Sequence, residues 1–236
     1  MTEPVLITVS GKSEIHHPAE RGTVTLVVSF EASDAGRAFE PAARVHATIT
    51  EELRALASRE PAPITWWSSG RLQTSSRRPW NQEGKVLPPV FTTATQLEAK
   101  FADFGELAAW TSRAALVDGV TVRGIEWALT ERTRDELRAQ VRREAVAAAT
   151  GKAEAYAESL GLGEVVPVAI ADPGMLEAGM NPYEPVAPMG MRLAAAAPDV
   201  GGALEFSPDH ITVEATVHAR FTAGGAAQQG DVSAAR

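Results

Sequence analysis

The chain has 236 residues, of which 44% are hydrophobic and 22% charged, and its formal net charge is -8. A chain of this length buries enough surface to fold without a metal or a disulfide, and the absence of cysteine excludes a disulfide framework, a thiol nucleophile and thiolate metal ligands. The acidic balance disfavours nucleic acid as a partner. No run reaches the roughly 18 apolar residues of a membrane span, and the opening MTEPVLITVSG has no signal-peptide pattern, so we expect a cytoplasmic protein without a membrane span.

The first part of the chain predicts two strands and a helix. Apolar and polar residues alternate over 5–15 and 22–31, which is typical of strands with one buried face. Helical spacing follows over 34–57. Pro41 would clash with the preceding turn, so this helix should be kinked there or begin near Glu40.

The middle of the chain predicts two strands, a second helix and a further strand. Residues 64–75 are interpreted as a single strand, and 91–101 as a strand with a mostly apolar face. A cap-like Asp and Glu pair opens the helix over 103–117. In the strand over 120–129 the apolar face changes at Gly124, which predicts a β-bulge.

The third helix, over 133–160, is the longest and is rich in alanine, so it can lie close to a sheet or to another helix. Gly151 in its interior costs about 1 kcal/mol relative to alanine, and a close packing contact there would offset that cost. A short strand follows over 165–170, and its Pro167 places it at a sheet edge or at a bulge.

The composition changes after this strand. Residues 174–207 are rich in Pro, Met and Ala and are predicted as a long loop or lid, or as a disordered segment. A closing strand over 211–221 and a flexible tail over 224–236 follow. The resulting order, ββαββαβαββ, indicates an α+β fold with mostly antiparallel sheets and three interspersed helices. We expect one domain over 1–223, either single or built from two intertwined subdomains.

Several segments occur in a distinctive order. They are ITVSGKSEI followed by TVTLVVSFEA, the stretch TATQLEAKFADFGELAAWTSRAALVDGVTVRGIEWAL, the Ala-rich ELRAQVRREAVAAATGKAEAYAESLGL, the loop PVAPMGMRLAAAAPD and the strand ITVEATVHARF. Together they resemble the SIMPL-domain family. The resemblance extends from Val5 to Phe221, with Pro-Ala-Glu at 18–20 where the family usually has Pro-Asp. It implies a bacterial protein with the family fold, no established catalytic residues and a tendency to assemble, since family members have been associated with oligomers at the cell envelope and, in a eukaryotic branch, with signalling-adaptor roles.

No pattern in the chain predicts a catalytic, cofactor-binding or metal site. His16 and His17 are adjacent in a predicted strand, where neighbouring side chains point to opposite faces, so they cannot readily bind one ion. Neither a G-x-S-x-G elbow nor a G-x-G-x-x-G or Walker pattern occurs. We therefore expect a protein that is not an enzyme and uses no cofactor.

One group of aromatic and basic residues is a candidate interface. Such residues can stack on bases and hold phosphates, but they are also favoured in protein interfaces, and the net charge of -8 makes subunit contact the better interpretation. The group comprises Trp66, Trp67, Arg71, Arg77, Arg78 and Trp80.

Two functions remain open at this point. The first is a non-enzymatic role in oligomeric assembly or partner binding, with a homo-oligomer or another protein as partner. The alternative is a small-molecule or peptide binding protein that uses the loop over 174–207 as a lid. The adaptable apolar contacts of that lid would come from Met175, Met180, Met189 and Met191.

Overall fold

The computed structural model describes residues 3–80, 86–176, 208 and 210–224, and these divide into two compact units. The terminal unit contains residues 3–17, 131–176 and 212–224, and the central unit contains the described residues between 18 and 130 together with 208, 210 and 211. Each unit has its own sheet and its own apolar core.

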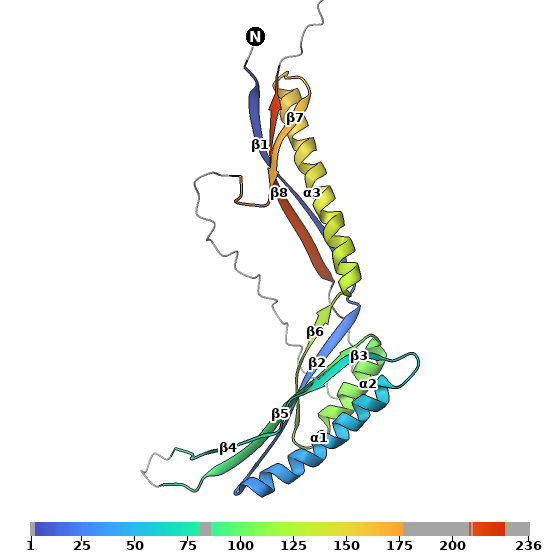
Figure 1. Cartoon of the computed structure of the whole chain (residues 1–236), viewed down its shortest axis with the longest axis vertical. Coiled ribbons are helices and arrows are strands. Elements are labelled where there is room, and N and C mark those ends of the chain that lie inside the picture. Colours follow the sequence, from blue (N-terminus) through green and yellow to red (C-terminus); the bar gives the residue numbers. More distant parts are fainter. Residues whose placement is uncertain (1–2, 81–85, 177–207, 209, 225–236) are drawn as a thin grey trace, which may run out of the picture. The chain divides into compact units, whose positions relative to one another are not determined.

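The central unit is built on an antiparallel sheet with the order β3-β5-β2-β6, in which β4 also pairs with β5 (Figure 1). Its strands are β2 (Arg21–Ala32), β3 (Ile64–Ser69), β4 (Gln73–Arg77), β5 (Val90–Phe101) and β6 (Val120–Ala128).

Helices α1 (Ala35–Ala57) and α2 (Phe104–Ala115) cover one face of this sheet (Figure 1). The face beneath them presents alternate residues of β2, namely Val24, Leu26 and Val28, which are fully or almost fully buried. The residues between them on β2 are only half-buried, as expected for the open face of an antiparallel sheet. The buried apolar face of the sheet therefore explains the position of both helices.

A side-chain carboxylate caps the start of each helix. Asp34 accepts a hydrogen bond from the Arg37 amide at 2.9 Å, and Asp103 accepts one from the Glu106 amide at 3.0 Å. Because α1 begins at Ala35 and continues through Pro41, the expected start near Glu40 is wrong.

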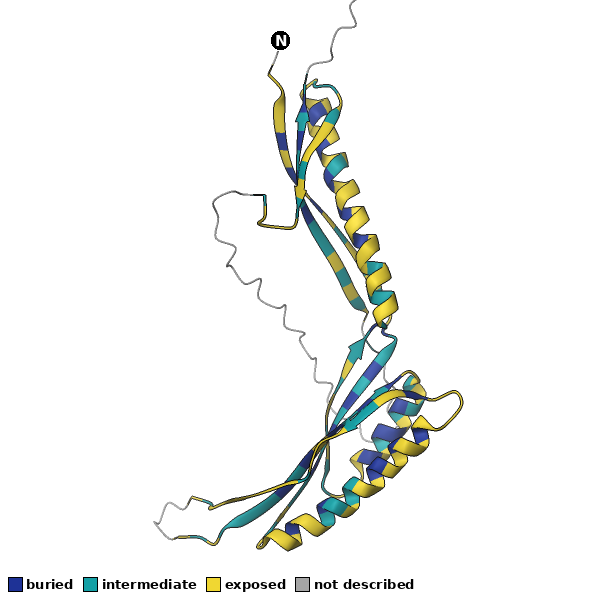
Figure 2. Ribbon diagram, in the orientation of Figure 1, coloured by how far each residue is buried: buried dark blue, intermediate teal, exposed yellow. Residues whose placement is uncertain are grey.

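The terminal unit has a three-stranded sheet with the order β1-β8-β7 and one long helix, α3 (Glu131–Ser159), along one face (Figure 1). Its strands are β1 (Val5–His17), β7 (Val165–Ala171) and β8 (Ile211–Ala223). A stripe at four-residue spacing on α3 is buried against this sheet, while the outer side of the helix is exposed (Figure 2). The stripe comprises Val141, Ala145, Ala149, Ala153 and Ala157.

The glycine that allows this close packing is on the strand. A Cβ built on Gly11 of β1 would overlap the backbone of α3 at Ala145 and Ala149. By contrast, a Cβ on Gly151 would meet no atom within 4 Å, so the expected close contact at Gly151 is wrong. The prediction that the alanine-rich helix lies close to a sheet is confirmed.

The α+β fold with three helices and mostly antiparallel sheets is confirmed, with one difference in the strands. The single strand expected over 64–75 is two strands, β3 and β4, because the chain leaves the ladder over 70–72. The bulge at Gly124 is confirmed by a register shift opposite Thr25 and Leu26. Within the described sheet, Pro167 lies on the edge strand β7, beside a second register shift.

No helix in the described ranges is long and apolar enough to cross a membrane. Of the predicted loop over 174–207, only residues 174–176 fall within the described part of the chain, and of the predicted tail only Gly224 does.

Candidate functional site

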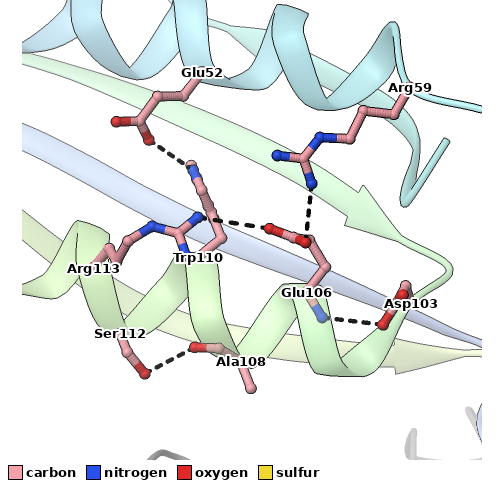
Figure 3. Close-up of polar contacts among 8 residues, drawn as sticks. All are labelled: Glu52, Arg59, Asp103, Glu106, Ala108, Trp110, Ser112 and Arg113. Atoms are coloured by element: carbon pink, nitrogen blue, oxygen red, sulfur yellow. Dashed lines mark hydrogen bonds and ion pairs between the residues drawn. The ribbon is translucent and has the colours of Figure 1, made fainter.

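Polar contacts concentrate between α1 and α2 in the central unit (Figure 3). Glu106, in the first turn of α2, accepts a hydrogen bond from Arg59 at 3.0 Å and lies 3.6 Å from a guanidinium nitrogen of Arg113. Arg59 follows the end of α1, so one carboxylate connects the two helices. The side chain of Glu106 is about a quarter exposed, and this makes the ion pairs less screened than fully exposed ones.

A second contact joins the same helices through a buried aromatic ring. The Trp110 ring on α2 is 1% exposed, and its Nε1 donates to Oε2 of Glu52 on α1 at 3.0 Å (Figure 3). A buried indole N–H requires an acceptor, so this contact fixes the orientation of the ring in the core. The ring lies 5.6 Å from that of Phe101, measured between centroids.

A groove of about 190 Å³ lies beside these contacts. Apolar and charged side chains both line it, a combination that can hold a small ligand. However, ligand pockets usually measure about 300–1,000 Å³, so this groove is too small for most ligands. It is lined by Arg44, Val45, Thr48, Ile49, Glu52, Arg113, Ala114 and Val117.

One serine and histidine pair has the spacing of a nucleophile and its base. Nε2 of His46 on α1 lies 2.5 Å from Oγ of Ser69 on β3. Acyl transfer also needs backbone donors for the oxyanion, yet the Gly70 amide already donates to the Gln96 carbonyl at 2.8 Å. In the described part of the chain, no carboxylate is bonded to the other nitrogen of His46. No sequence pattern indicated this contact, because the two residues are 23 positions apart.

The two tryptophans of the candidate interface lie on opposite faces of β3, as expected for neighbouring strand residues. Trp67 packs against the central core, and the Arg54 guanidinium lies 5.8 Å from its ring centroid. Trp66 is exposed on the other face, with Nζ of Lys100 at 5.9 Å from its centroid.

The other four members lie along the β4 segment. Arg77 bonds to Glu31 at 3.2 Å, and Nη1 of Arg78 donates to the Leu87 carbonyl at 3.4 Å. The Arg77 hydrogen bond, with a further one from a threonine, holds the pKa of the Glu31 carboxyl below its ordinary value. Arg71 is exposed, and Trp80 is 82% exposed. The two tryptophans thus lie on opposite faces of β3, and the other four residues lie in or beside β4. The role of the six residues in an interface stays a prediction.

The lid residues are largely outside the described ranges. Met175 is exposed, and Met180, Met189 and Met191 belong to the part of the chain that the structure does not describe. The lid hypothesis therefore remains a prediction.

The ring of His16 contacts two other side chains of the terminal unit. Nδ1 of His16 is 2.9 Å from Oγ1 of Thr212, and its Nε2 is 3.7 Å from the Glu14 carboxylate. Within the described ranges, no three His, Asp or Glu side chains are arranged to hold a metal ion.

The same face of the terminal sheet carries an exposed charged cluster. Lys12 bridges Glu214 at 2.9 Å and Glu14 at 3.3 Å. The hydrogen bond to Glu214, followed by that to Glu14, raises the pKa of the Lys12 ammonium above its ordinary value. Because all three groups are exposed, solvent screens this cluster strongly.

The most distinctive surface is the edge strand β7. It pairs with β8 on one side, and in the described sheet its other side has no strand partner. Val166, Val168 and Ile170 are 56%, 57% and 55% exposed. A run such as VVPVAI is typical of a buried strand, so the sequence alone did not indicate that these side chains face solvent.

A comparison with protein families matches residues 7–221 to a model described as "SIMPL: Protein of unknown function (DUF541)". The chain belongs to the SIMPL family. The match includes every helix of both units and confirms the resemblance found in the sequence.

Other comparisons add little to this SIMPL-family assignment. No curated protein matches the chain. Among solved structures, the chain is similar to a hydantoinase/carbamoylase family amidase from Burkholderia ambifaria, with 20% sequence identity and a TM-score of 0.24 over 54% of this chain. The match spans about a third of the amidase (34%), and at this TM-score it carries no argument about fold or activity.

Proposed function

We propose that this SIMPL-family protein acts in assembly rather than catalysis, and that copies of the chain associate through the β7 edge. The observation that supports this most directly is the exposure of three neighbouring aliphatic side chains, Val166, Val168 and Ile170, on an edge strand. Exposed edges of this kind are templates for pairing with another chain, and natural proteins protect them with charges, prolines or bulges. β7 has a proline, Pro167, and a register shift beside it, but no charged residue.

The composition of β7 favours a second copy as the occupant of this edge. The strand VVPVAIA contains no charged residue, so an apolar strand edge of a second copy can approach it without leaving a charge unpaired. Burial of the exposed half of each aliphatic side chain contributes about 1 kcal/mol.

The strand alone is too short to form a stable interface. Specific interfaces bury about 1,200 Å² or more, which is more than one seven-residue strand supplies. Additional apolar surface is available from α3, which contacts β7 and exposes Tyr156 near its C-terminal end, followed by the exposed Leu160. We therefore expect the contact to include both the strand edge and the end of this helix.

Sedimentation velocity tests the proposal. The parent chain should sediment above the single-chain mass of 25.0 kDa at micromolar concentration, and Val168→Lys should sediment as a single chain. Leu116→Lys is the control, because Leu116 is 88% exposed but lies in the central unit. A parent that sediments at 25.0 kDa throughout, or a Val168→Lys variant that assembles like the parent, would contradict the proposal.

The alternative of a small-molecule or peptide binder stays a prediction. It depends on a loop that lies mostly outside the described residues, and the groove between α1 and α2 is small for such a ligand.

A further inference from the structure

The two edges of the terminal sheet differ in a way that bears on how copies would associate. In the described sheet, β1 and β7 flank β8, and each has one side without a strand partner. β1 extends over thirteen residues and contains no proline, whereas β7 has seven residues and includes Pro167. Proline has no backbone N–H to donate to a neighbouring strand.

This difference disfavours pairing of β7 with itself. Two β7 strands side by side would bring two prolines and two register shifts into one short ladder. Pairing of β7 with β1 involves only one proline and one shift. The ladder with fewer prolines and register shifts is therefore the one between β7 and β1.

The apolar residues of both edges also lie at the same level of the sheet. The start of β1 lies beside the end of β8, because a Cβ on Gly224 would lie 3.9 Å from Cβ of Pro4. The end of β1 lies beside the start of β8, because His16 contacts Thr212. The two strands therefore run in opposite directions. Because Pro4 lies beside Gly224, Leu6, two residues further along β1, is level with Thr222, two residues back along β8. Val166 is the register partner of Thr222 on the other side of β8.

Leu6 and Val166 also belong to the same face. Their neighbours Ile7 and Val165 pack in the core beneath α3, so Leu6 and Val166 are on the face that α3 does not cover. Both are exposed, at 57% and 56%. A second copy placed beside the first without inversion would bring its Leu6 next to Val166 and would keep both α3 helices on one face of a continuous sheet.

We propose that β7 of one copy pairs with β1 of the next, in a head-to-tail contact that joins Val166 to Leu6. This inference rests on the proposed self-association and names the surface that receives β7. β1 and β7 both run opposite to β8, so they would pair as parallel strands. Such a contact leaves one edge free on each outer copy, so assembly continues until a ring closes or a filament forms.

Two edge variants test the geometry. Leu6→Lys and Val166→Lys each place a charge on one side of the contact, so each variant alone should sediment as a single chain of 25.0 kDa. An equimolar mixture still contains one intact pair of edges, the β7 of Leu6→Lys and the β1 of Val166→Lys. The mixture should therefore form a species of two chains, and labels on the two variants should show one copy of each.

The outcomes separate this inference from the proposed function. Assembly of Leu6→Lys like the parent, with Val166→Lys monomeric, would overturn the role of β1 but would retain self-association through β7. A mixture that stays monomeric would overturn the head-to-tail contact. A parent that never assembles would overturn both proposals. Leu116→Lys should assemble like the parent, which shows that a surface lysine alone has no effect.

Discussion

Gly11 on β1 and Ala149 on α3 lie where the sheet and the helix of the terminal unit are too close to leave room for a side chain on the strand. A Cβ built on Gly11 would be 2.9 Å from Cβ of Ala149 and would overlap the backbone of Ala145. Real Cβ atoms essentially never approach this closely, so any side chain at position 11 must displace α3. Because the helix packs through small alanines along its length, its distance from the sheet depends on this glycine.

Gly11→Ala should therefore destabilise the protein, although it adds only one methyl group. Overpacking of a tight contact typically costs about 1–3 kcal/mol, and the obstacle here includes backbone atoms that cannot rotate away. Thermal unfolding followed by circular dichroism should show a lower midpoint for the variant.

Gly151→Ala is the matched control for that variant. A Cβ at Gly151 meets nothing within 4 Å, and alanine is favoured over glycine in a helix interior by about 1 kcal/mol. This variant should unfold at the same or a higher temperature than the parent. Equal stability of the Gly11→Ala variant and the parent would show that α3 is not held against β1 as described.

Trp110→Phe should destabilise the central unit through the loss of one hydrogen bond. Without the indole N–H, the Glu52 carboxylate loses a donor, and hydrogen bonds to charged groups contribute about 1.5–3 kcal/mol. Glu52→Gln keeps an acceptor for Trp110 and should cost about 1 kcal/mol or less. Urea unfolding of the two variants checks the order. A larger loss for Glu52→Gln than for Trp110→Phe would contradict this account of the contact.

The fold was predictable where one face of a strand is buried and the other is not. The alternation in β2 and β5 corresponds to residues that lie beneath α1 and α2, so the pattern of the sequence is the pattern of burial. Local chemistry also predicted the bulge at Gly124 and the edge position of Pro167. These features depend on one segment and its immediate neighbours.

Features that depend on contacts between distant segments were not predictable. α1 continues through Pro41, and Ala38 and Ala42 on either side of it are fully buried, so tertiary packing supports the helix there. The sequence contains glycines at 11 and 151, but only the topology shows which of them meets another backbone. Helix propensity pointed to Gly151 rather than Gly11 as the site of a close contact, because glycine is unfavourable inside a helix.

In the candidate interface too, local geometry could be predicted and contacts between distant segments could not. Opposite faces for Trp66 and Trp67 follow from strand geometry and could be predicted. The separation of Arg77, Arg78 and Trp80 from them could not, because it depends on the break between β3 and β4. The exposure of the β7 side chains was also not predicted: Pro167 indicated an edge or a bulge, but the uncharged aliphatic pattern of the strand is typical of buried side chains.

The contact between Ser13 on β1 and Glu144 on α3 predicts a pH-dependent contribution to stability. The Ser13 hydroxyl donates to the Glu144 carboxylate at 2.6 Å, and this hydrogen bond, followed by one from Gln140, lowers the pKa of Glu144 below its ordinary value of 4.5. A carboxyl whose pKa is lower in the folded state stabilises the fold above its unfolded pKa. That contribution is lost as the pH falls through the lowered folded value.

Ser13→Ala should consequently lower the midpoint of thermal unfolding at neutral pH, and its difference from the parent should shrink as the pH is lowered below about 4. Ser10→Ala is the matched control: this exposed β1 serine bonds Lys152 through its carbonyl, at 2.6 Å, which the substitution retains. The control should show no such pH dependence. Unfolding midpoints measured between neutral and acidic pH test the sign, because a Ser13→Ala difference that stays constant or grows on acidification would mean that the hydroxyl does not stabilise the ionised form of Glu144.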